Sequence, residues 1–333
     1  MAFFYRMKPV VINCVTLRKL QNSCKKEYQM LRDYYQRIKD SKFLPWLMLL
    51  ALVMIWGSSF ILIKRGLEVY SSVEVGAIRI FTSFLILMPF AIKRLRKVSS
   101  KSLFIIFVIG FLGTGLPAFL FARAQTQIDS SLAGILNSLT PLFTLVIGLV
   151  FFKQKTRWIN VTGVFLGLLG ALGLIYSTSN GSFEFHFSFA VYAVIATVLY
   201  AIQSNMIKYY LNEVPSLTIA SLGFFFIGIP VTVLLFFFTD FPQTLVSHPG
   251  GFRAFFYVAV LGIFASAIAI IIYNKLVQIT NAVFATSVTY FVPVVALIWG
   301  IWDGERFPMI TFLFVGVILF GVFMVNKRRR WRA

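Results

Sequence analysis

The sequence predicts an all-α integral membrane protein whose ten transmembrane helices form two inverted five-helix repeats. Three observations carry this prediction: the composition, ten long apolar segments, and similarity between the two halves of the chain. Hydrophobic residues make up 59% of the 333 residues and charged residues 13%, whereas soluble domains average about 45–50% and about 25%. Because so little polar surface cannot coat a soluble particle of this size, these proportions argue against an ordinary soluble domain.

The ten apolar segments are long enough to cross a bilayer as helices, which requires about 20 apolar residues because every backbone polar group must be satisfied internally. They cover residues 43–63, 75–92, 102–122, 130–152, 158–176, 187–207, 216–238, 253–273, 282–302 and 307–325. Pro45 and Pro308 lie near helix starts, where a missing N–H costs little. The runs exceed the length of barrel strands and lack strict alternation, which favours helices.

The formal net charge of +20 is distributed unevenly along the chain. In a soluble protein it would suggest nucleic-acid binding, but here the cations avoid the apolar segments. One side of the membrane receives 25 of the 31 Lys and Arg residues and the other side five, with Arg79 alone inside a segment. The positive-inside rule therefore places both termini in the cytoplasm of a multi-pass protein of the cytoplasmic (inner) membrane. We expect a lipid bilayer and no nucleic acid as partner.

The two halves of the chain resemble each other. A shift of 152 residues aligns Pro141 with Pro293, and a shift of 144 aligns Trp56 with Tyr200. Each half thus holds five segments, and an odd number gives the second half the opposite orientation. Such inverted repeats are typical of secondary transporters, whose substrate site lies near mid-membrane; a duplicated scaffold without transport is the alternative. The predicted regions are a basic cytoplasmic N-terminal tail (1–42), a first repeat (43–176), a second repeat (187–326) and a basic cytoplasmic C-terminal tail (327–333).

Three short motifs resemble the EamA repeats of the drug/metabolite transporter superfamily. They are Trp56-Gly57-Ser58-Ser59-Phe60 with Lys64 and Arg79 downstream, Asn137-Ser138-Leu139-Thr140-Pro141-Leu142, and Thr289-Tyr290-Phe291-Val292-Pro293-Val294 followed by Gly304-Glu305. The resemblance covers about residues 43–326. It implies ten spans in two EamA repeats, and export or exchange of small metabolites such as amino acids or related amphipathic compounds.

Pro141 and Pro293 indicate where a central cavity would form. A proline inside a helix leaves the carbonyl four residues earlier without its donor, and these carbonyls belong to Asn137 and Thr289. We predict two helix kinks, with Asn137 and Thr289 lining the cavity from opposite halves. The alternative is a purely structural kink in which both residues satisfy local backbone groups.

Other polar and aromatic side chains within the segments are further candidates for substrate contact. They are Ser58, Ser59, Thr114, Gln203, Asn205, Ser266 and Tyr290, with Trp56, Tyr200 and Tyr273 as aromatic surfaces that could stack a solute. Such residues also serve as interhelical hydrogen bonds or packing. The run Gly163, Gly167, Gly170 and Gly173 predicts close packing within a monomer, with weak homodimerisation as the alternative.

Arg79 is the cation inside a segment, where an ionisable group is costly and functional by default. It would hold an anionic or carboxylate-bearing substrate, pair with Glu74 or Glu68, or cap carbonyls of a neighbouring helix. A carrier for phosphorylated or nucleotide-linked sugars is a less favoured function, because it needs several converging cations. A non-transporting membrane sensor is a further alternative.

Acidic residues lie only near the segment ends, and the chain has two separated histidines and two cysteines in its basic tail. The sequence therefore predicts no metal, no cofactor, no catalytic residues and no enzymatic activity. Proton-coupled carriers usually need a buried group that titrates, so we expect facilitated or weakly coupled movement of the solute.

Overall fold

The computed structural model describes residues 43–128, 130–178, 187–292, 294–295 and 309–326. Over these residues the chain is helical and contains no strand, which confirms the predicted all-α membrane class. The predicted tails (1–42 and 327–333) and Pro293 lie outside the described residues. The contacts discussed below are within residues 48–326, which belong to one compact unit.

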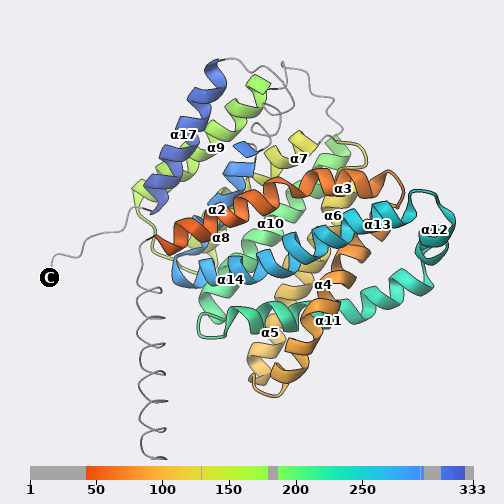
Figure 1. The fold of residues 1–333 in the computed structure, drawn as a ribbon. Coiled ribbons are helices and arrows are strands. Elements are labelled where there is room, and N and C mark those ends of the chain that lie inside the picture. Colours follow the sequence, from red (N-terminus) through yellow and green to blue (C-terminus); the bar gives the residue numbers. More distant parts are fainter. Residues whose placement is uncertain (1–42, 129, 179–186, 293, 296–308, 327–333) are drawn as a thin grey trace, which may run out of the picture. The chain divides into compact units, whose positions relative to one another are not determined.

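The first five predicted segments each coincide with helical structure (Figure 1). Segment one contains α2 (Leu44–Gly57) and α3 (Ser59–Leu67), and segment two is α4 (Ser72–Leu95). Segment three contains α5 (Ser100–Gly110), η1 (Phe111–Gly115) and α6 (Leu116–Ala124). Segment four contains α7 (Ser130–Asn137) and α8 (Thr140–Val150), and segment five is α9 (Trp158–Thr178).

The second half follows the same order. Segments six and seven are α10 (Phe187–Tyr210) and α11 (Ser216–Phe237), followed by a short α12 (Phe241–Ser247). Segment eight contains α13 (Gly251–Val260), η2 (Leu261–Ile268) and α14 (Ala269–Ile279). Segment nine begins with α15 (Ala282–Thr286) and η3 (Ser287–Phe291), and segment ten is α17 (Met309–Asn326). Among the described residues, six helices are long and apolar enough to cross a membrane, and four shorter apolar helices lie in the other four segments.

The third and eighth segments both contain a π-helical stretch, η1 and η2. The stretches correspond under the 152-residue shift, which aligns Gly110 with Gly262. A Cβ on Gly110 would lie 2.9 Å from the backbone of Gly223, and one on Gly262 would lie 2.7 Å from the carbonyl oxygen of Arg79. Close backbone contact with the second helix of the other half therefore occurs at the start of each π segment, at Gly110 just before η1 and at Gly262 within η2.

Carbonyls in η2 receive hydrogen bonds from first-half side chains. The Ser83 hydroxyl donates to the Gly262 carbonyl over 2.8 Å, and Trp56 Nε1 donates to the Ala265 carbonyl over 2.8 Å. A π turn disturbs the regular hydrogen-bond ladder of a helix, and buried backbone carbonyls normally have a partner. These two side chains supply it and join α2 and α4 to η2.

The loop before α4 is tied to the start of α13. The Tyr70 hydroxyl donates to the Gly251 carbonyl over 2.9 Å, and Ser71 and Glu74 form a capping box at the start of α4. Burial, with a smaller contribution from the Glu74 carboxylate, raises the pKa of Tyr70 to about 12. Tyr70 therefore stays protonated, and a donor, throughout the physiological pH range.

Helices α9 and α17 lie side by side (Figure 1). The predicted glycine run makes this contact possible: a Cβ on Gly163 would lie 2.7 Å from the Gly321 carbonyl, and one on Gly170 would lie 2.9 Å from the Ile318 backbone nitrogen. Close packing within the chain thus occupies these glycines, as small residues at helix interfaces allow.

Replacing Gly170 with leucine is expected to separate α9 from α17. The new side chain meets backbone atoms of α17, which cannot move aside as a flexible side chain would, so we expect a loss of about 1–3 kcal/mol of stability. The thermal unfolding midpoint of the purified protein in detergent measures this loss. Gly316→Leu on α17 is the matched control, because nothing lies within 4 Å of a Cβ there; equal midpoints for the two variants would contradict the prediction.

Candidate functional site

A cavity that is partly open, with an empty volume of about 680 Å³ including its open part, lies between the two halves of the chain. Its lining is shared almost equally between the halves. The first half contributes Trp56, Ser59, Phe60, Ile63, Arg79, Phe121, Asn137 and Thr140, and the second half contributes Tyr200, Gln203, Ile270, Tyr273, Thr286, Val288 and Thr289.

Much of the lining is repeat-related. The pairs that correspond under the 144- or 152-residue shift are Trp56 with Tyr200, Ser59 with Gln203, Phe121 with Tyr273, and Asn137 with Thr289. Both halves therefore present an aromatic ring and a polar group at equivalent positions. Arg79 breaks this correspondence, because the residue 144 positions later is Gly223, which is not part of the lining.

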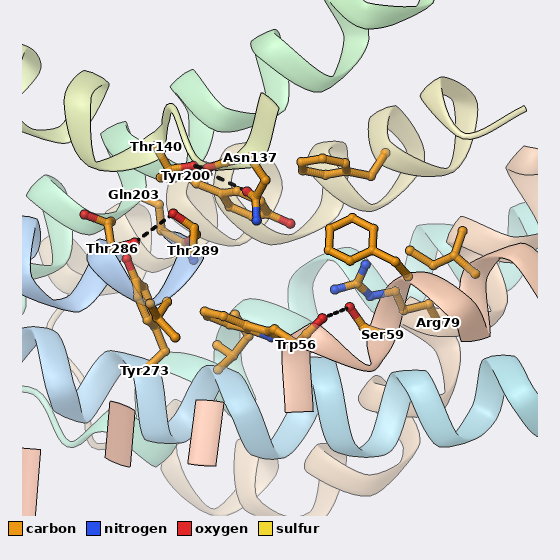
Figure 2. Close-up of a pocket in the computed structure, with 15 residues that line it drawn as sticks. Trp56, Ser59, Arg79, Asn137, Thr140, Tyr200, Gln203, Tyr273, Thr286 and Thr289 are labelled. Atoms are coloured by element: carbon orange, nitrogen blue, oxygen red, sulfur yellow. Dashed lines mark hydrogen bonds between the residues drawn. The ribbon is translucent and has the colours of Figure 1, made fainter. Parts of the chain in front are cut away.

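The two ends of the cavity differ chemically (Figure 2). Arg79 and Ser59 lie toward one end, whereas Thr286 and Thr289 lie toward the other, with Trp56 between them. The threonine hydroxyls donate to helix backbone, Thr286 to the Ala282 carbonyl over 3.0 Å and Thr289 to the Thr286 carbonyl over 3.0 Å. Because a hydroxyl has one proton and two lone pairs, these oxygens face the cavity as hydrogen-bond acceptors.

Segment four breaks where the sequence predicts a kink. Helix α7 ends at Asn137, and α8 starts at Thr140 with Pro141 in its first turn, a position that suits proline because no intrahelical donor is needed there. The Thr140 hydroxyl donates to the Asn137 carbonyl over 2.7 Å. The freed carbonyl thus finds a local partner, while the Asn137 side chain lines the cavity.

The equivalent residue of segment nine lies in the 3-10 helix η3. The Thr289 carbonyl accepts a hydrogen bond from the Ser138 hydroxyl, next to Asn137, over 3.3 Å. The Thr289 side chain lines the cavity, as Asn137 does. The two polar positions singled out by the prolines therefore meet at one site from opposite halves.

Arg79 is half-buried on α4 and points into the cavity (Figure 2). Its Nε donates to the Ser266 hydroxyl over 2.5 Å, and the Tyr200 hydroxyl is a neighbour of its guanidinium. Glu68 pairs with Arg65 over 2.6 Å, and Glu74 is used by the capping box. Arg79 forms no ion pair with any residue that the structure describes, so of the three alternatives for Arg79 the pairing with Glu74 or Glu68 is wrong.

Thr114 and Ser266, the candidates in η1 and η2, lie behind the lining. Thr114 accepts a hydrogen bond from Gln203 Nε2 over 3.2 Å, and Ser266 accepts the one from Arg79. Each π segment thus positions a cavity residue of the other half. Neither hydroxyl is itself part of the cavity wall.

Three other candidates are also absent from the lining. Asn205 donates to the Thr144 carbonyl over 3.0 Å and accepts from Gln154 over 3.0 Å, which ties α10 to α8. The Tyr290 hydroxyl donates to the Val164 carbonyl on α9 over 2.9 Å. Ser58 is half-buried at the junction of α2 and α3. Asn205 and Tyr290 thus make the interhelical connections that were the alternative to substrate contact.

The lining also contains residues that the sequence does not single out: Phe60, Ile63, Phe121, Thr140, Ile270, Thr286 and Val288. Thr286 precedes Thr289 by three residues, a spacing that places both on one helix face. This spacing could have identified Thr286 as a lining residue from the sequence. The apolar lining residues could not be identified in this way, because these helices are apolar nearly all round.

Trp56 and Tyr273, proposed as stacking surfaces, lie in the wall with ring centroids 5.3 Å apart. The described residues hold no group of three or more metal-ligating side chains.

Comparison with known proteins agrees with this architecture. The model of the EamA-like transporter family matches twice, over residues 44–176 and 188–327. An uncharacterized transporter of Archaeoglobus fulgidus is 24% identical over 85% of this chain and 99% of its own length. The uncharacterized inner membrane transporter YedA of Escherichia coli (strain K12) is 27% identical over 84% of this chain and 89% of its own.

A relative with a more specific name is the "Probable terminal-alkyne amino-acid exporter" of Streptantibioticus cattleyicolor, 22% identical over 85% of this chain and 93% of its own. A protein of known crystal structure shares the fold, with a TM-score of 0.66 at 16% identity over 86% of this chain and 97% of that one. The two family matches together cover most of the sequence, one on each half. This chain is a multi-pass membrane protein that belongs to the EamA-like transporter family.

Proposed function

We infer that the protein moves small amphipathic metabolites, a group that includes amino acids and related compounds, out of the cell by alternating access of the central cavity. The observation that carries this proposal is the cavity itself: both halves line it, with repeat-related aromatic and polar residues and one arginine. Secondary transporters built from inverted repeats hold their substrate at such an interface. The name of the exporter relative supports the outward direction.

The proposed movement is a rocking of one half against the other. The break between α7 and α8 and the two π segments supply interruptions at which helices can bend, since kinks concentrate at proline and at π turns. The distribution of 25 cations on one side and five on the other supports cytoplasmic termini in the inner membrane.

The lining argues against a carrier of phosphorylated or nucleotide-linked sugars. Phosphate recognition uses several charge-assisted hydrogen bonds from converging cations, and Arg79 is the one cation among the described lining residues. The cavity also argues against a sensor without transport, because a site shared by two repeats suits a carrier. We expect the protein to act as a monomer or weak homodimer.

An untargeted comparison of metabolites in expressing cells and their medium tests the proposed function. Cells with the wild-type protein should deplete at least one small metabolite and enrich it outside, and Asn137→Leu should abolish that change, because it removes a polar cavity group at the break between α7 and α8. Asn212→Leu is the matched control, an exposed asparagine in the loop after α10. Identical metabolite profiles for Asn137→Leu and the wild type would overturn the assignment of the cavity.

Transport of that metabolite should not require a proton gradient. The described lining contains no carboxylate and no histidine, the groups whose titration usually couples transport to protons. In proteoliposomes, efflux should therefore proceed at a similar rate with and without an imposed pH difference. Flux that appears only when the gradient is imposed would contradict this expectation.

A further inference from the structure

The cavity carries one positive charge that nothing in its described lining compensates. Arg79 forms no ion pair among the described residues, and the other fourteen lining residues are neutral. The counterpart of Arg79 in the second half is Gly223, which lies against Gly110 instead of the cavity. The lining thus has corresponding aromatic and polar residues in both halves, but a charged residue in only one of them.

Ser266 determines where the guanidinium points. It is 2% exposed and accepts a 2.5 Å hydrogen bond from Arg79 Nε, so this nitrogen is occupied by the opposite half. The terminal nitrogens of the guanidinium are the part that faces the cavity, beside Tyr200 (Figure 2). A guanidinium in this arrangement suits a carboxylate, which it can bind through two parallel hydrogen bonds.

The net charge of the solute decides how well the occupied cavity is balanced. A zwitterion satisfies Arg79 with its carboxylate, but its ammonium group finds no carboxylate partner in the lining, and the complex keeps the charge of the empty site. A solute with one carboxylate and no ammonium neutralises the site. Away from water, an uncompensated charge is far more costly than at a surface.

We propose that the cavity selects monocarboxylates of net charge −1, with an apolar or aromatic body, over zwitterionic α-amino acids. This inference rests on the proposed function and narrows it to the chemical class of the solute. The body would lie against the rings of Trp56 and Tyr273, whose centroids are 5.3 Å apart, and against Phe121, which stacks on Tyr200 at 5.9 Å. Flat apolar groups pack well against such rings.

The threonines at the end of the cavity remote from Arg79 indicate which groups the far end of the solute should carry. The oxygens of Thr286 and Thr289 act there as acceptors, because their protons are donated to backbone carbonyls. A neutral donor such as a hydroxyl or an amide N–H on the far end of the solute would satisfy them. The favoured solute is therefore a monocarboxylate whose opposite end is apolar or a neutral donor.

Four probes that share a 2-phenylethyl body and differ in charge test the proposal. They are 3-phenylpropanoate, phenylalanine, 3-phenylpropanamide and 2-phenylethylamine, each titrated calorimetrically into the purified full chain at neutral pH. We expect 3-phenylpropanoate to bind at least about 10-fold more tightly than each of the other three. Arg79→Met should weaken 3-phenylpropanoate binding by about 30-fold and leave the neutral amide unchanged.

Three variants separate the roles of charge, positioning and folding. Ser266→Ala should weaken the carboxylate probe several-fold without affecting the amide, and Ser266→Thr, which restores a hydroxyl, should recover it. Arg65→Met removes an exposed arginine whose partner is Glu68 and should change nothing. If Arg79→Met does not fold, Arg79→Lys should keep the preference for the anion but bind it more weakly, because lysine lacks the bidentate fork.

Phenylalanine binding as tight as 3-phenylpropanoate would overturn the inference, as would an Arg79→Met protein that keeps the anion preference. Failure of all four probes to bind would also overturn it. None of these results contradicts the proposed function, which fails separately if Asn137→Leu leaves the cellular metabolite profile unchanged.

Discussion

Gly262→Val should abolish transport and remove most of the correctly folded protein. A Cβ at this position would overlap the Thr82 hydroxyl and lie 2.7 Å from the Arg79 carbonyl oxygen. The backbone of α4 cannot yield without displacing Arg79 from the cavity, so the variant either unfolds or separates α4 from η2. We expect a destabilisation of about 3 kcal/mol or more, at the upper end for overpacked interiors.

The folded yield after size-exclusion chromatography and the thermal unfolding midpoint both report this change. Gly316→Val is the matched control, with no atom within 4 Å of its Cβ. The double variant Gly262→Ala with Thr82→Ala should be more stable than Gly262→Ala alone, because it removes the overlap with the Thr82 hydroxyl. It should still be less stable than the wild type, because the close contact with the Arg79 carbonyl remains. Such coupling is expected for residues in contact. A Gly262→Val protein as stable as Gly316→Val would show that α4 and η2 do not touch.

Trp56→Phe should destabilise the protein although an aromatic ring is kept. The indole N–H donates to the Ala265 carbonyl in η2, and phenylalanine leaves that carbonyl without its donor, at a cost of about 1–3 kcal/mol. Trp56→Ala also removes the ring that contacts Tyr273, and the total should reach about 3–5 kcal/mol. Both variants should lower transport, because Trp56 joins the cavity wall to η2.

The control for this series is Trp158→Phe, since Trp158 is 84% exposed at the start of α9. The thermal unfolding midpoint in detergent should fall in the order wild type, Trp158→Phe, Trp56→Phe and Trp56→Ala. The rate of flux in proteoliposomes should fall in the same order. If Trp56→Phe and Trp158→Phe were equivalent, the hydrogen bond to η2 would have no energetic role.

The order of the spans could be predicted from sequence because their signal is strong: a helix that crosses a bilayer must be long and apolar. The structure differs at several segments that are divided into shorter elements. In segment four the sequence predicts a kinked helix around Pro141, and the structure has two helices. The Thr140 hydroxyl explains the difference, because it supplies the Asn137 carbonyl with a donor and lets α7 end there.

The site was only partly predictable because the helix faces could not be assigned. The sequence offers Thr114 and Ser266 as candidates for substrate contact, yet both lie behind the cavity lining. They lie in π-helical stretches, which break the regular α-helical pattern and so change the direction of the side chains that follow. A periodicity of 3.6 residues does not describe such stretches, so only the structure separates residues that line the cavity from those that position them.

Arg79, the one cation in the described lining, should also orient the proposed solute. Two identical halves would offer a bound molecule two equivalent poses, head-to-tail and tail-to-head. The residue that corresponds to Arg79 in the second half is Gly223, which carries no charge, so the two poses are unequal. We therefore expect each solute molecule to sit in one pose, acid group toward α4. A chiral solute held this way would present a single arrangement of its substituents to the wall, so mirror-image isomers should be carried at different rates.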